Sequence, residues 1–306
     1  MNFIKRNYLK YTDSMAYAIY KEKKRDEDLV NRIRQINAEP LVMPRKSEYS
    51  FKHSGNCGDI ICAMPAMLAL AEEQEEANIS LYLRTGQELP NQGTMKHPLG
   101  NVTLNEQMVQ MLAPLMLAQK RFSRCETYHN QPVDYDLDRF RDYPLLHDRG
   151  NISRWYFLVF PVYYDLSCPW LAVKPSPVTQ DSIVVARSSR YRMPLIDHRF
   201  LREYPNIFFV GLEEEYIEMR EQIPGMNFLK VVDFLQLAEL IAGSRLFIGN
   251  QSFPFALAEG LKVNRLLELY YKAPTTSVTG RNGFDFCFQQ QFEYLVRTRY
   301  EQGADK

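Results

Sequence analysis

The feature that most constrains the fold is a regular alternation of short apolar segments with helical segments in the second half of the sequence. The apolar segments have the length of buried strands and are residues 182–186, 206–211, 226–231, 244–249 and 264–269. The helical segments between them are residues 195–204, 213–222, 233–242 and 253–261. Near-continuous apolar strands that alternate with helices are typical of a parallel sheet covered on both faces, because each crossover lays a helix over the sheet. The second half is therefore predicted to be α/β.

The first half follows the same order with less regularity. An alternating segment at residues 49–53 leads into a turn with two glycines at residues 54–59, and apolar residues at helical spacing continue from Ile60 to Leu70. Residues 78–84 then have the pattern of a strand and residues 104–118 that of a Met- and Leu-rich helix. This succession predicts a second α/β unit.

Clustered prolines mark the boundary between the two halves, since Pro169, Pro175 and Pro177 interrupt the pattern there. The predicted segments are a helical extension at residues 1–46, a first α/β domain at 47–175, a second at 176–275 and a C-terminal segment at 276–306. In the extension, residues 14–37 are predicted to form one helix with an intermittent apolar stripe. In the C-terminal segment we expect a helix that crosses back onto the first domain.

The charge balance argues against a protein that binds DNA mainly through phosphates. Such proteins usually carry a basic surplus, whereas here 37 Lys and Arg balance 37 Asp and Glu. Residues 1–46 hold 11 basic and 6 acidic residues, a local charge of +5. This segment is therefore either a solvated helix surface or a basic arm.

Other functional classes are made less probable by what the sequence lacks. The five cysteines are scattered without a C-x-x-C pair, and the carboxylates form no cluster with metal-ligand spacing, so neither a disulfide framework nor a metal site is expected. No apolar stretch reaches the ~18 residues of a membrane span, and the first residues lack the pattern of a signal peptide. We expect a cytoplasmic protein without a transmembrane segment.

Two loops are candidate binding sites, because ligands of open parallel sheets bind beyond the carboxyl ends of the strands. Residues 249–254 join a strand to a helix, with Ser252 as the expected N-cap and Pro254 near the first helical position. Free backbone N–H groups at such a helix start favour a phosphate or another anion, although an ordinary capped helix has the same pattern. Residues 54–59 are the counterpart in the first half, and their glycines permit close approach of a ligand.

At these two loops the sequence resembles a known family. Residues 58–70, which run Gly-Asp-Ile-Ile-Cys-Ala-Met-Pro-Ala-Met-Leu-Ala-Leu, resemble the opening motif of the ADP-heptose glycosyltransferases. Residues 246–260 resemble the strand, Gly-Asn/Asp-x-Ser-Gly-Pro and helix signature of the same family. In layout the resemblance covers residues 48–270. It implies the GT-B fold, in which two Rossmann-like domains place their parallel sheets on either side of a cleft, here with an N-terminal helical extension.

The resemblance also implies a reaction. A heptosyltransferase-like enzyme would hold a nucleotide-diphosphate sugar in the second domain and transfer the sugar to a hydroxyl of an acceptor held by the first. The transfer is expected to invert the anomeric centre and to need neither a metal nor another cofactor. The acceptor is left open as a glycan, a lipid-linked sugar or a modified nucleic acid.

Residue roles follow by position in the two motifs. Asp59 is the candidate base, with helix capping as the alternative, and His53 is the second candidate base. Arg187, Ser188 and Arg190 match the loop whose basic residue reaches the diphosphate, and a guanidinium suits phosphate. The remaining donor-binding candidates are Gln251, Ser252 and Glu259, with Glu268 as an alternative to Glu259 for the ribose. The candidates of the acceptor-side loop are Ser54, Gly55, Asn56 and Gly58.

The chain departs from the family pattern at two positions, with Phe253 where a Gly is usual and Ala256 where a His is typical. These departures keep open a second hypothesis, a protein of the same fold that has lost catalysis and acts as a binding partner. A third hypothesis is a glycosyltransferase that acts on modified bases in DNA and uses the basic arm to reach the backbone. Binding that falls steeply with salt would favour the third.

Overall fold

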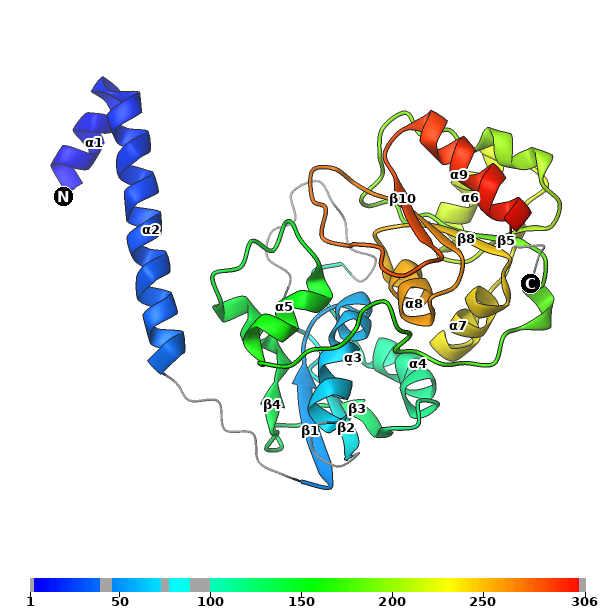
Figure 1. Ribbon diagram of the computed structural model, residues 1–306, viewed down its shortest axis with the longest axis horizontal. Coiled ribbons are helices and arrows are strands. Elements are labelled where there is room, and N and C mark those ends of the chain that lie inside the picture. Colours follow the sequence, from blue (N-terminus) through cyan, green and yellow to red (C-terminus); the bar gives the residue numbers. More distant parts are fainter. Residues whose placement is uncertain (1–2, 39–45, 73–76, 89–99, 303–306) are drawn as a thin grey trace. The chain divides into compact units, whose positions relative to one another are not determined.

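The computed structural model describes residues 3–38, 46–72, 77–88 and 100–302, and the chain divides into two compact units (Figure 1). One unit comprises residues 1–44 and 139–145, and the other comprises residues 45–138 and 146–306. In the first unit, helix α1 (Phe3–Thr12) precedes helix α2 (Ser14–Ala38), which coincides with the predicted helix at 14–37. The carboxylate of Asp13 accepts the N–H of Ala16 at 2.9 Å and so caps α2, whose first turn leaves such donors free.

The second unit begins with a four-stranded parallel sheet in the order β3-β2-β1-β4. Its strands are β1 (Glu48–His53), β2 (Asn78–Leu83), β3 (Phe122–Thr127) and β4 (Tyr135–Asp136). The α-helices of this half are α3 (Cys57–Glu72), α4 (Glu106–Leu117) and α5 (Ile152–Val159). The short 3-10 helix η1 (Leu137–Asp142) leads from this sheet into residues 139–145 of the first unit. Helix α3 is apolar on most of its surface and almost wholly buried, as expected for a helix packed on several sides.

A six-stranded parallel sheet follows, in the order β10-β9-β8-β5-β6-β7. Its strands are β5 (Ile183–Ala186), β6 (Ile207–Phe209), β7 (Asn227–Phe228), β8 (Leu246–Asn250), β9 (Arg265–Glu268) and β10 (Gly283–Phe286). Its helices are η2 (Pro177–Thr179), η3 (Arg199–Glu203), α6 (Glu213–Gln222), α7 (Phe234–Gly243), α8 (Phe253–Leu261) and α9 (Gln289–Gln302). The α/β prediction is therefore confirmed in both halves.

The predicted pattern differs from the structure in the helix expected at residues 195–204. Only the 3-10 helix η3 forms there, over residues 199–203. Leu195 has φ 66°, which is a left-handed conformation that an α-helix does not contain. The helix cannot begin at this residue, so the segment shortens to a single turn.

The C-terminal segment also differs from the expected helix that crosses back onto the first domain. Its first element, β10, extends the six-stranded sheet beside β9. Phe292, Leu295 and Val296 of α9 are then buried in the core of that sheet, together with Ile183 and Leu266. The segment stays with the second sheet, because its apolar side chains complete that core and would otherwise face water.

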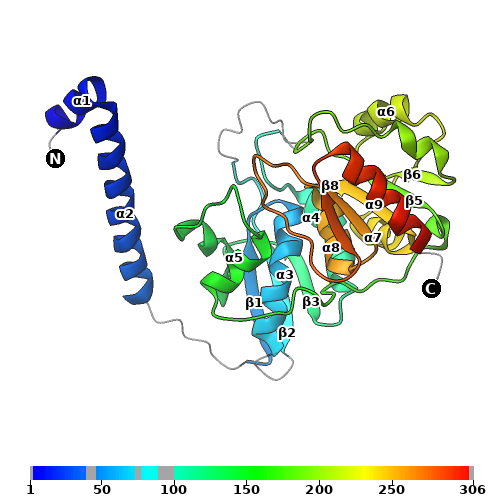
Figure 2. The ribbon, with the colours of Figure 1, turned by 45° about the horizontal axis from the view of Figure 1, so that its top comes forward.

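The two sheets of the second unit meet through their helices, as Figure 2 shows in a second orientation. Helix α3 contacts α8, and α4 contacts α7. The Trp170 indole N–H donates to the carbonyl of Ile61 at 3.1 Å, which ties the connecting segment to α3. A Cβ added to Gly58 would lie 3.7 Å from the Cα of Phe253, so the first turns of α3 and α8 approach each other closely. Both helices begin at the carboxyl end of a parallel strand, which is where α/β sheets bind ligands.

No helix in the described ranges is both long enough and apolar enough to cross a lipid bilayer. The cytoplasmic location stays a prediction.

Candidate functional site

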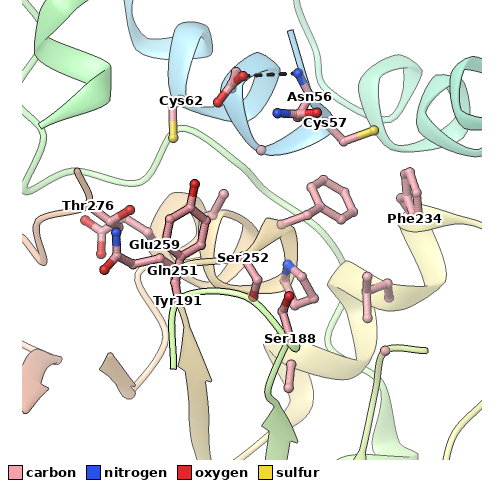
Figure 3. A pocket seen from close by; sticks show the side chains of 18 of the residues that line it. Asn56, Cys57, Cys62, Ser188, Tyr191, Phe234, Gln251, Ser252, Glu259 and Thr276 are labelled. Carbon is pink, nitrogen blue, oxygen red and sulfur yellow. Dashed lines mark hydrogen bonds between the residues drawn. The ribbon is translucent and has the colours of Figure 1, made fainter. Parts of the chain in front are cut away.

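A cavity of about 660 Å³ lies between the two sheets, at the starts of α3 and α8. Figure 3 shows Asn56, Cys57 and Cys62 on one wall and Ser188, Tyr191, Gln251 and Ser252 on the opposite wall. The volume lies within the range of small-molecule and cofactor sites. Among the predicted site residues, those that line it are Asn56, Gly58, Asp59, Arg187, Ser188, Arg190, Gln251, Ser252 and Glu259.

Asp59 both lines the cavity and caps a helix. It is the third residue of α3, and its Oδ2 accepts the backbone N–H of Asn56 at 3.1 Å. The negative charge of this carboxylate also raises the pKa of two thiols of the same helix. Burial, and after it the charge of Asp59, raises the pKa of Cys57 and Cys62 to about 12, so these cysteines are neutral thiols. The capping role is thus observed, and the same residue lines the cavity.

His53, the second candidate base, lies outside the lining of the cavity and is fully buried. Its Nδ1 accepts the N–H of Gly55 at 2.8 Å, and its Nε2 lies 2.7 Å from the hydroxyl of Tyr156. Both ring nitrogens are therefore engaged within the fold. The structure argues against His53 as the base, because a base must reach the proton that it removes.

Ser54 and Gly55 shape the acceptor-side loop without lining the cavity. The N–H of Ser54 donates to Asp138 at 3.1 Å, and its carbonyl accepts the hydroxyl of Thr103 at 2.6 Å. A Cβ at Gly55 would lie 2.5 Å from Cε1 of His53, so only glycine fits there. This glycine serves internal packing and not the approach of a ligand, which corrects the sequence interpretation.

Asn56 is the member of this loop that a ligand could use. Its side chain lines the cavity, and its Oδ1 is buried with no hydrogen-bond partner. A buried amide oxygen without a partner is costly, since it has lost its water without gaining a donor. A ligand hydroxyl at this position would supply the missing donor.

Arg187 forms a bidentate ion pair with Glu268 and is therefore not available to bind a diphosphate. Its Nε and Nη2 donate to the two oxygens of Glu268 at 2.6 and 2.7 Å, and both side chains are buried. The N–H of Met193 donates to the same carboxylate at 2.7 Å. Glu268 is likewise fully engaged and unsuited to bind a ribose. The pair closes the base of the loop from 187 to 193.

Arg190 differs from Arg187, because its guanidinium forms no ion pair with any residue that the structure describes. Its Nε is buried without a hydrogen-bond partner, and the guanidinium lies 5.7 Å from the ring centre of Tyr191. The side chain lines the cavity. An unpaired guanidinium beside an open cavity favours an anionic ligand.

Asn250 positions the loop that carries Arg190, and sequence reasoning did not assign it this role. Its Oδ1 accepts the N–H of Ser188 at 3.0 Å, and its Nδ2 donates to the carbonyls of Ser188 and Arg190 at 2.9 and 2.6 Å. The side chain is fully buried. A polar residue at the end of the apolar strand β8 was the signal that could have revealed it.

The side chains of Gln251 and Ser252 line the cavity and form hydrogen bonds within the fold. The side chain of Gln251 accepts the N–H of Tyr270 at 2.7 Å and donates to the carbonyl of Ala273 at 2.8 Å. The hydroxyl of Ser252 donates to the carbonyl of Asn250 at 3.1 Å and does not cap α8, contrary to the expected N-cap bond. The first turn of α8 thus keeps N–H groups that its N-cap side chain does not satisfy.

Glu259 is engaged in a buried network and is not free to bind a ribose. One carboxylate oxygen accepts Nε of Arg265 at 2.6 Å, and the other accepts the ammonium of Lys262 and the hydroxyl of Thr279. Burial lowers the pKa of Lys262 to about 8. Glu259 therefore lines the cavity while it holds Lys262 and Arg265 in place.

Further residues of the lining carry chemistry that the sequence analysis did not single out. Glu215 is buried, accepts the N–H of Ser189 at 2.8 Å, and has its pKa raised by burial. Lys230 also lines the cavity, is exposed, and pairs with Glu213 at 3.0 Å. In the described ranges no group of three or more His, Cys, Asp or Glu side chains could hold a metal ion. Metal-independent chemistry stays a prediction.

No protein-family model and no curated protein sequence matches this chain. Solved structures do match it. A family 9 glycosyl transferase from Veillonella parvula DSM 2008 superimposes with a TM-score of 0.57 at 10% identity, over 86% of this chain and 99% of that one. The E. coli ADP-heptose lipopolysaccharide heptosyltransferase II superimposes with a TM-score of 0.58 at 11% identity, over 83% of this chain and 99% of that one. This chain has their fold.

The E. coli heptosyltransferase WaaC, solved with ADP, gives a TM-score of 0.56 at 8% identity, over 82% of this chain and 99% of that one. The heptosyltransferase-like GT-B fold predicted from the two motifs is therefore confirmed. The cavity lies between the two sheets of this fold, and both resembling motifs border it.

Proposed function

We propose that this chain is a glycosyltransferase that moves a sugar from a nucleotide-diphosphate donor to an acceptor hydroxyl. The observation that carries the proposal is the unpaired guanidinium of Arg190 at a cavity onto which the first turn of α8 also opens. Guanidinium groups and helix starts both favour phosphate. WaaC, which shares the fold, was solved with ADP and with an ADP-2-deoxy-2-fluoro heptose.

The proposed chemistry places the donor on the wall formed by the second sheet and the acceptor beside α3. The acceptor oxygen attacks the anomeric carbon on the side opposite the diphosphate, so a new C–O bond forms as the bond to the leaving phosphate oxygen breaks. The acceptor proton passes to the carboxylate of Asp59. Inversion follows from attack on the face opposite the leaving group.

The negative charge that develops on the leaving diphosphate needs stabilisation. Arg190 and the backbone N–H of Phe253, at the start of α8, are the groups proposed for it. Asn250 and the Arg187–Glu268 pair act indirectly, because they fix the loop from which Arg190 extends. Preorganised donors contribute most when they need not move during the reaction.

A thermal-shift comparison of nucleoside diphosphates with the corresponding nucleosides tests donor binding. A ligand that binds only the folded state raises the melting temperature by mass action. We expect the diphosphates of one nucleobase to stabilise the chain more than their nucleoside. No stabilisation by any diphosphate would contradict the proposal.

Donor turnover then separates an enzyme from a protein that only binds. Release of nucleoside diphosphate from the matching sugar donor, lost in Asp59→Ala while binding persists, supports the transferase. Binding without release in the native chain would instead support a binding protein. The hypothesis of modified bases in DNA stays a prediction.

A further inference from the structure

Helix α2 carries a seam of apolar side chains that no described residue of its own unit buries. Residues Met15, Ile19, Leu29 and Ile33 are 71%, 59%, 38% and 42% exposed, and α2 contains no buried residue. Four large apolar side chains along one face of a helix are expected to be buried against something.

The seam repeats with the spacing of a coiled coil. Met15, Ile19, Glu22, Asp26, Leu29 and Ile33 follow one another at intervals of 4, 3, 4, 3 and 4 residues. This alternation keeps one line of side chains facing a partner helix along several turns. The centre of the line is acidic and both of its ends are apolar.

Helix α1 packs on a different face of α2. The two helices contact each other within their unit, with α1 folded back beside the start of α2 (Figure 1). Ala16, Tyr17 and Tyr20 are the half-buried residues in the first two turns of α2, whereas Met15 and Ile19 are exposed. Residues 16, 17 and 20 lie about 100–200° around the helix from Met15. The contact with α1 therefore leaves the seam open.

The seam is symmetric about Lys24, which points to the kind of partner. Met15 and Ile33 lie nine residues on either side of it, Ile19 and Leu29 lie five, and Glu22 and Asp26 lie two. A line with the same order of apolar and acidic residues in both directions matches itself when a second copy runs antiparallel. Such a contact is isologous, with each residue meeting its symmetric counterpart.

The acidic residues at the centre of the seam weaken the pairing, and neighbouring cations offset part of this cost. In an antiparallel pair centred on residue 24, Glu22 of one copy faces Asp26 of the other, and these acids need cations nearby. Lys23 and Arg25 flank the seam one residue on either side of the centre. The antiparallel arrangement places Arg25 beside the partner's Glu22 and Lys23 beside the partner's Asp26. Polar residues at a seam select register and orientation, at a cost in affinity.

We infer that α2 is a dimerisation helix that pairs antiparallel with α2 of a second copy of this chain, centred on Lys24. The outer layers join Met15 to Ile33 and Ile19 to Leu29, and the charged layers lie between them. With only four apolar residues from each copy, the pair is expected to be weak and to depend on protein concentration.

Sedimentation equilibrium of the full chain tests the pairing. The weight-average mass should rise with concentration from 35.9 kDa toward twice that value. Ile19→Glu should abolish this rise, since it buries a carboxylate against Leu29. Asn31→Glu is the matched control, because Asn31 is exposed on the opposite face of α2. A monomer at all concentrations, or equal loss in both variants, overturns the inference.

Mixing two variants tests the relative orientation of the two α2 helices. It also shows whether a variant lost the dimer because it misfolded, since a misfolded variant would not regain it in the mixture. Ile19→Glu and Leu29→Lys should each be monomeric alone, and an equimolar mixture should regain the dimer. Only the antiparallel pair places the new Glu opposite the new Lys. A mixture that stays monomeric refutes the antiparallel arrangement. Binding of the native chain to phospholipid vesicles without any self-association would assign the seam to a membrane surface instead.

Discussion

Replacing Arg190 with alanine should weaken the binding of nucleoside diphosphates while leaving the fold intact. In the described part of the chain, the guanidinium of Arg190 pairs with no carboxylate, and its Nε has no hydrogen-bond partner. Its contact with the ring of Tyr191, at 5.7 Å, contributes only about 0.5–1 kcal/mol. Truncation therefore removes little that stabilises the protein without ligand.

The loss of affinity follows from the bonds that a diphosphate would make. A hydrogen bond to a charged group contributes about 1.5–3 kcal/mol, and about 1.4 kcal/mol corresponds to a factor of ten. One such bond from Arg190 therefore predicts a roughly 10- to 150-fold higher Kd for the diphosphate. The nucleoside has no phosphate, so its Kd should barely change.

Thermal shift gives the assay. At a ligand concentration of about 1,000 times the native Kd, binding stabilises the folded protein by ~4.1 kcal/mol. A variant that binds tenfold more weakly gains only ~2.7 kcal/mol at the same ligand concentration. Arg220→Ala is the matched control, because Arg220 is exposed on α6 and does not line the cavity. The melting temperature of Arg190→Ala without ligand should equal that of the native chain.

Two results would refute this reasoning. Unchanged affinity of Arg190→Ala for diphosphates would remove Arg190 from the anion site. Equal losses for diphosphate and nucleoside would show that the substitution distorts the cavity and does not delete a phosphate contact.

Three further predictions follow from the same site. Asp59→Asn should lower turnover by roughly 10²–10⁴-fold with donor affinity unchanged. A role in capping alone predicts normal activity, since the amide oxygen of Asn can accept the same N–H of Asn56. Glu268→Gln leaves Arg187 buried and unpaired and should cost about 3–5 kcal/mol of unfolding free energy in urea titrations, which exposed Glu221→Gln should not. Burial raises the pKa of Glu215 above 4.5, so the folded state retains a proton that the unfolded chain releases. The free energy of unfolding should therefore fall as pH rises from about 4.5 through the raised pKa of Glu215, and this fall should be smaller in Glu215→Gln.

The strands of the second sheet show what can be predicted from sequence. All five apolar segments contain a strand. The pattern is clearest in β5 and β8, which are buried along their whole length, because a strand buried on both faces must be largely apolar. β7 is only two residues long and has none buried. The sixth strand, β10, was not predicted. It begins with Gly283, lies at the edge of the sheet and has only Phe286 buried, so it lacks the continuous apolar pattern.

The loop from 187 to 190 shows where prediction of the site stopped. Arg187 and Arg190 have the same side chain, three residues apart, and the sequence gives no reason to separate them. Glu268 pairs with Arg187 from 81 positions away, which leaves Arg190 as the unpaired cation. Likewise, the hydroxyl of Tyr156, 103 positions away, lies within hydrogen-bond distance of Nε2 of His53, so this nitrogen is not available as a base.

The sequence by itself determined the α/β architecture and the two loops that border the cavity, because hydrophobic periodicity and glycine turns are local properties of the chain. Only the tertiary structure decided which charged side chains remain available to a ligand. Availability depends on whether a partner of opposite charge lies within hydrogen-bond distance. Segments far apart in the sequence supply that partner, and folding alone brings them together.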